Sequence, residues 1–202
     1  MTTSVPSPST VVEWREFLRR YNSEFLNSSY LRRAEAEGRA KWLMTEGQRQ
    51  AGWLGHEPAS EEAILATEAR LGVALPPTYR NFLLAGNGWS SMAYSLDLVK
   101  VEEIGWFSEA DPGLLAAWSE PGMEDFADWV TLLKRCVLIS NDDGGSGGNW
   151  LLHVDGNAEN SEWTAYEWWP GDGSDPEPFD NFAVLVDSLW KATAEPEDKD
   201  VV

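Results

Sequence analysis

The chain has 202 residues, with 15 Lys and Arg against 34 Asp and Glu, which gives a formal net charge of −19. Phosphate contacts require Lys and Arg, so this balance argues against direct binding of nucleic acid. No apolar run approaches the ~20 residues that a membrane-spanning helix needs, and the first ten residues lack the basic and apolar regions of a signal peptide. We therefore expect a cytoplasmic protein of one domain, without a membrane partner.

Few residues are suited to metal binding or nucleophilic catalysis. The single cysteine, Cys136, lies in an apolar run and is expected to be a buried small hydrophobic residue. The two histidines, His56 and His153, lie in different predicted elements and do not form a zinc site without several carboxylates. A Ser140–His153–Asp155 triad lacks the sharp turn that presents a nucleophile. We expect no metal, no cofactor and no catalytic residue.

The first third of the chain predicts helices. Residues 1–11 are rich in Ser, Thr and Pro and are expected to be disordered. Residues 12–54 are predicted to form a helical extension, because a stripe at helical spacing runs from Trp14 to Phe25. A second helix is predicted through residues 30–50, and its expected buried members are Tyr30, Ala34, Trp42 and Leu43.

Residues 60–90 predict a pair of short helices. Ser60 can cap the first helix, whose apolar face includes Ile64, Leu65 and Leu71, and Gly72 can end it in a left-handed turn. Pro76-Pro77 favours a second helix start, and the stripe Tyr79, Phe82, Leu83 is expected to be buried before Gly86-Asn87-Gly88 ends the helix.

The spacing of these residues resembles the opening motif of the SUKH superfamily, the Smi/Knr-like domains. The matching positions are Ile64, Glu68, Leu71-Gly72, Leu75-Pro76, Tyr79, Phe82-Leu83 and Asn87-Gly88-Trp89. The resemblance extends more weakly over residues 55–193, which we assign to a SUKH-like domain. It implies a non-catalytic α+β domain. Many bacterial members are immunity proteins that neutralise a cognate toxin, and fungal members are regulatory interaction modules.

After Trp89 the pattern becomes strand-like. Strands are predicted around Leu96, over the apolar run 135–140, over 150–155 and over 163–169, followed by a helix with Phe182 and Leu189 on its buried face. Residues 109–130 are predicted to form broken helical turns, and 194–202 an acidic tail. This order predicts a single α+β domain, with a mainly antiparallel sheet packed against helices and an N-terminal helical extension.

The Gly-rich segment 142–148 begins with Asp142 and Asp143 and is best explained as a hairpin turn. A phosphate-binding loop would need a following Lys and helix, and a calcium loop would need liganding oxygens at other positions. The segment around Asp172 and Asp175 is interpreted in the same way, as a turn with two carboxylates.

Negative charge is concentrated in the second half of the chain. Residues 1–60 hold 8 Lys/Arg and 7 Asp/Glu, whereas residues 101–202 hold 4 and 23. We expect a basic protein partner, most plausibly a toxin domain such as a nuclease, since an acidic surface accelerates capture of a cationic partner. Solubility alone is an alternative explanation of this charge.

The predicted partner-binding residues combine carboxylates with aromatic anchors. They are Asp142, Asp143, Asp172 and Asp175, with Trp106 or Trp169 as the anchor, because Trp is common at the centres of interfaces. Two other functions remain open. The domain could be a regulatory or scaffold module of the same fold, or a hydrolase that uses paired acidic residues beside tryptophans, as glycosidases do.

Overall fold

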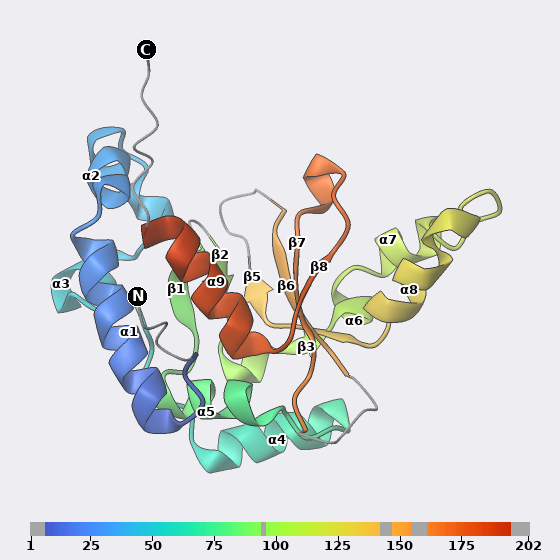
Figure 1. The fold of residues 1–202 in the computed structure, drawn as a ribbon, viewed down its shortest axis with the longest axis horizontal. Coiled ribbons are helices and arrows are strands. Elements are labelled where there is room, and N and C mark those ends of the chain that lie inside the picture. Colours follow the sequence, from blue (N-terminus) through green and yellow to red (C-terminus); the bar gives the residue numbers. More distant parts are fainter. Residues whose placement is uncertain (1–6, 94–95, 142–146, 155–160, 195–202) are drawn as a thin grey trace, which may run out of the picture.

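The computed structural model describes residues 7–93, 96–141, 147–154 and 161–194, and the following account concerns these residues alone. Helices at the N-terminal end precede two antiparallel sheets, and a final helix packs back against the first ones (Figure 1). The chain therefore has the predicted α+β architecture. Asp142 and Asp143 lie outside the described residues.

Of the two predicted N-terminal helices, the first is present and the second is divided. Helix α1 (Val11–Leu26) begins with a capping box in which the Thr10 hydroxyl accepts from the Glu13 N–H and the Glu13 carboxylate accepts from the Thr10 N–H. The predicted second helix is divided into α2 (Ser29–Ala36), η1 (Ala40–Trp42) and α3 (Glu46–Ala51). Gly38 adopts a φ of +70°, which favours glycine and interrupts the helix. Trp42 is 55% exposed rather than buried.

The central helix pair is present as predicted. Helix α4 (Glu61–Leu71) is capped by Ser60, whose hydroxyl accepts from Ala63 N–H, and ends at Gly72 in the left-handed conformation. Helix α5 (Pro77–Ala85) follows directly. The side chains of Ile64, Tyr79, Phe82 and Leu83 are fully buried, whereas Leu65, predicted on the same face, is 56% exposed.

The strands form two sheets rather than one. The first contains β1 (Trp89–Ala93), β2 (Leu96–Leu98) and β5 (Ser140–Asn141) in that order. The second has the order β3-β4-β6-β7-β8, and its strands are β3 (Gly105–Trp106), β4 (Cys136–Leu138), β6 (Asn149–His153), β7 (Ala165–Trp168) and β8 (Glu177–Phe179). All the neighbouring strands are antiparallel.

The apolar run 135–140, predicted as one central strand, is shared between the two sheets. Residues 136–138 form β4 of the larger sheet and residues 140–141 form β5 of the smaller one. Ile139 lies between them: its N–H donates to Trp150 O at 3.1 Å, and its carbonyl accepts from Val99 N–H at 3.0 Å. This short connection joins the two sheets, and Cys136, Val137, Ile139 and Ser140 of the run are buried.

The larger sheet has hydrophobic residues packed on both faces. On β6, Trp150 and Leu152 belong to the large cluster that we call the main core, while Leu151 faces a smaller one, the outer cluster. This division follows from the alternation of side chains along a strand. Helix α9 (Phe182–Ala194) covers the main-core face. The outer cluster contains Phe107, Leu115, Val130, Leu133, Cys136, Leu151 and Trp168.

Residues 107–133, the outer segment, cover the other face of the larger sheet. The segment contains α6 (Phe107–Ala110), α7 (Pro112–Ala117), η3 (Glu124–Phe126) and α8 (Ala127–Leu133). Figure 1 shows it on the side of the molecule far from α1–α3. The remaining short helices are η2 (Val101–Glu103) and η4 (Pro170–Asp172).

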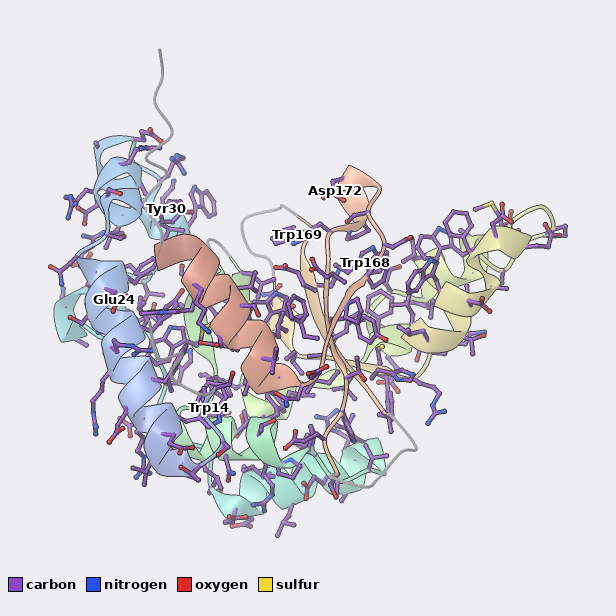
Figure 2. All side chains as sticks on the ribbon, viewed as in Figure 1. Trp14, Glu24, Tyr30, Trp168, Trp169 and Asp172 are labelled. Atoms are coloured by element: carbon purple, nitrogen blue, oxygen red, sulfur yellow. The ribbon has the colours of Figure 1, made fainter. Side chains whose placement is uncertain are left out.

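The N-terminal helices contribute directly to the main core. Trp14 is fully buried, and its Nε1 donates to Thr78 O at 3.0 Å (Figure 2). The Tyr21 hydroxyl donates to Ser91 O at 2.6 Å, and the Ser91 hydroxyl donates to Leu43 O at 2.6 Å. Helices α1 and α2, and the segment around Leu43, thus pack into the same cluster as α5 and α9. The boundary at residue 54, between the helical extension and the SUKH-like domain, stays a prediction.

Candidate functional site

The turn between β7 and β8 carries two of the predicted aspartates. Asp172 and Asp175 are both exposed. The hydroxyl and the backbone N–H of Ser174 lower the pKa of Asp172, with the backbone N–H 2.8 Å from Asp172 Oδ1. Trp168 Nε1 donates to Ser174 O at 3.0 Å, so the turn is attached to a buried side chain. Asp172 is therefore an ionised carboxylate held on an ordered turn.

Trp169 lies next to this turn but packs inward. Figure 2 shows Trp168 on the side of the outer segment and Trp169 on the other side, as the strand alternation predicts. The Trp169 ring packs directly on Gly148, and a Cβ atom at residue 148 would collide with the ring. Its indole also hydrogen-bonds to the Glu167 carboxylate. Trp169 is half-buried, and only part of its ring is available to a partner.

Glu167 is a feature that the sequence interpretation missed. Its carboxylate is half-buried and accepts a hydrogen bond from Trp150 Nε1 at 3.3 Å, in addition to that from Trp169. Burial raises the pKa of Glu167, and the nearby Glu177, paired with it across β7 and β8, raises it further. The available signal was the alternation of β7, which sets Glu167 on the same face as the buried Ala165.

Trp106 lies at the opposite edge of the larger sheet. It is on β3, which is three strand spacings from β7, or roughly 14 Å. Trp106 is half-buried and lines a cavity of about 320 Å³ together with Arg70, Glu109 and Ser140. Arg70 Nη2 donates to Ile104 O at 2.6 Å, so this guanidinium supports the cavity wall.

The structure thus brings together some of the predicted site residues. Asp172, Asp175 and Trp169 lie within one turn and its entry, whereas Trp106 is separated from them by the width of the sheet.

The described part of the chain gives little support for other kinds of site. Within these ranges, His, Cys, Asp and Glu side chains nowhere gather in groups of three that could hold a metal ion. Cys136 is buried in the outer cluster, and His153 lies beside the Tyr166 ring. No helix among the described residues combines the length and the apolar character needed to cross a bilayer.

Comparison with known sequences identifies the fold family. The model of the SMI1/KNR4 family (SUKH-1) matches residues 58–189, which include both helices of the central pair, both sheets and most of α9. No curated protein matches the chain. The match spans well over half of the 202 residues and includes the motif from Ile64 to Trp89. The chain therefore belongs to the SMI1/KNR4 (SUKH-1) family.

Proposed function

We propose that this protein is an immunity protein that neutralises a cognate bacterial toxin by stoichiometric binding, without catalysis. Domains of the SMI1/KNR4 family are commonly toxin-immunity or regulatory domains. The observation that carries the choice is the charge distribution, with 23 acidic and 4 basic residues after residue 100. Such a surface attracts a cationic protein and speeds its association.

The partner is proposed to be a basic toxin domain that acts on nucleic acid. Its Lys and Arg side chains would serve to bind phosphates, and the carboxylates of this chain would compete for the same side chains. Asp172 and Asp175, with Trp169 beside them, are the proposed charged contact. Asp142, Asp143 and Trp106 remain hypotheses of the sequence analysis, the first two outside the described residues.

The decisive experiment is neutralisation of the variable C-terminal domain of a secreted protein encoded next to this chain. Expressed alone, that domain should stop growth, and co-expression of this chain should restore it through a complex of fixed stoichiometry. A tight complex without any toxicity of the partner would instead support a regulatory module of the same fold.

The charge contribution is measured through association rates between about 50 and 500 mM salt, where the Debye length falls severalfold. The rate should fall with salt, and the Asp172→Asn/Asp175→Asn double variant should associate more slowly than wild type. If the association rates of wild type and of the double variant do not change with salt over this range, the acidic surface serves solubility only.

A catalytic role is tested by assaying purified protein on glycans, esters and nucleotides. We expect no turnover. Activity that persists through repeated purification and disappears on changing one Asp or Glu would contradict the binding function.

A further inference from the structure

The outer segment carries an open groove of about 430 Å³ where the end of α7 turns into η3 and α8. Its apolar lining consists of Trp118, Pro121, Met123, Ala127 and Val130. Methionine is flexible and polarisable, and it is common on surfaces that adapt to a bound side chain. The groove thus has the size and lining to take one or two apolar side chains of a ligand.

Acidic side chains line this groove, and its lining contains neither Lys nor Arg. Glu120 and Glu124 line it, and both are exposed. Glu124 accepts the backbone N–H of Gly122 at 3.0 Å, and this hydrogen bond lowers the pKa of its carboxyl. The outer segment contains six acidic residues and neither Lys nor Arg. An apolar floor under an unbalanced acidic rim is complementary to a ligand that combines apolar and cationic side chains.

The groove and the aspartate turn both contact the same buried side chain, Trp168. The Trp118 ring lies 5.6 Å from the Trp168 ring, and Trp168 Nε1 donates to the carbonyl of Ser174, which lies between Asp172 and Asp175. Trp118 also packs against Phe126, with the ring centroids 4.6 Å apart. Trp168 therefore links the groove, with its two rim carboxylates, to the turn that carries two more.

We propose that this groove is the docking site for a Lys/Arg-rich segment of the partner that inserts an apolar side chain between Trp118 and Met123. The cationic side chains of the segment then pair with Glu120, Glu124 and the aspartates of the turn. The proposal rests on the proposed function for the identity of the partner, but its chemistry is tested independently with a synthetic ligand.

The probe is a short synthetic peptide in which lysines alternate with leucines, titrated calorimetrically against the full chain. Two matched peptides replace each leucine by serine or each lysine by glutamate. The Lys/Leu peptide should bind at least about tenfold more tightly than either control, because both the apolar anchor and the charge contribute. In hydrogen exchange it should protect amides of residues 112–133.

Two charge-reversal variants locate the site. Glu120→Lys/Glu124→Lys should weaken the Lys/Leu peptide at least about tenfold. The control, Glu16→Lys/Glu24→Lys, makes the same change of charge at exposed positions of α1. It should weaken binding of the Lys/Leu peptide less than about twofold, because salt screens distant charges. Met123→Ser should also weaken binding, and every variant should keep a cooperative unfolding transition, which shows that it folds.

Equal losses in both double variants, or protection only outside residues 112–133, would overturn the groove as the docking site. The same variants distinguish this proposal from the proposed function. A toxin neutralised equally by wild type and by Glu120→Lys/Glu124→Lys overturns the groove alone. A groove that behaves as expected in a chain that neutralises nothing overturns the immunity function alone.

Discussion

The two faces of the larger sheet are covered by regions of very different construction. The main core unites helices from both ends of the chain, and its aromatic side chains are in mutual contact, as in the close pairs of Trp14, Phe82 and Phe182. Among the described residues, the outer cluster has seven buried members, and it is covered by helices of four to seven residues. Stability is therefore concentrated on one face of the sheet and is lower on the other.

The two regions also differ in how their acidic side chains are paired with basic ones. Among the helices that pack around the main core, several acidic side chains have basic partners, as in Arg49 with Glu35 and Arg80 with Glu61. In the outer segment six acidic residues have no Lys or Arg within the segment. Repulsion among them costs stability, and a bound cationic partner would relieve it. The contrast suggests that the main core maintains the fold while the outer segment is available for binding.

The largest effect is expected from truncating the centre of the main core. Phe82→Ala should reduce the free energy of unfolding by about 3–5 kcal/mol, because the side chain is fully buried and contacts Trp14 and Phe182. Denaturant unfolding measures this loss. A loss below about 1 kcal/mol would show that the main core does not supply most of the stability.

A smaller effect is expected in the outer cluster. Leu115→Ala should cost about 2 kcal/mol, the low end for a buried leucine, because the short helices can close around the space. In hydrogen exchange, amides of residues 112–133 should exchange faster while those of α5 keep their wild-type rates. If the amides of both regions exchange faster to the same extent, the two clusters form one cooperative unit and do not differ in stability.

The smallest effect concerns the half-buried Glu167 carboxylate on the main-core face of β7. Since burial raises the pKa of Glu167 in the folded state, the folded protein holds this proton more tightly than the unfolded chain does. The ionised Glu167 carboxylate therefore lowers the free energy of unfolding. This effect is fully present above the raised pKa of the folded state and disappears below the pKa of the unfolded chain, about 4.

At about pH 7 the Glu167→Gln variant should have a larger free energy of unfolding than wild type. This difference should shrink as the pH is lowered to about 4. Denaturant unfolding of both proteins at each pH gives the difference, with Asp175→Asn, an exposed carboxylate on the neighbouring turn, as the control. A difference that is constant with pH would mean that Glu167 titrates in the same way in both states.

Local signals in the sequence were sufficient for the central helices. Ser60, Gly72 and Pro76-Pro77 each act on the backbone of their own turn, so α4 and α5 have the predicted positions and caps. The strands over 150–155 and 163–169 were also found from their patterns, and β8 was missed because Pro178 and its acidic neighbours suggested a loop.

The sequence by itself thus determined the fold class, the family motif and the excess of negative charge, because each depends on residue type and short-range spacing. Tertiary structure decided how the run 135–140 divides between two sheets, since hydrogen-bond partners for Ile139 come from distant segments. It also decided that Trp169 packs on Gly148 and that Trp118, Met123 and Glu124 share a groove. Burial and surface grooves depend on which elements meet, and a residue's own neighbours in the chain do not specify that.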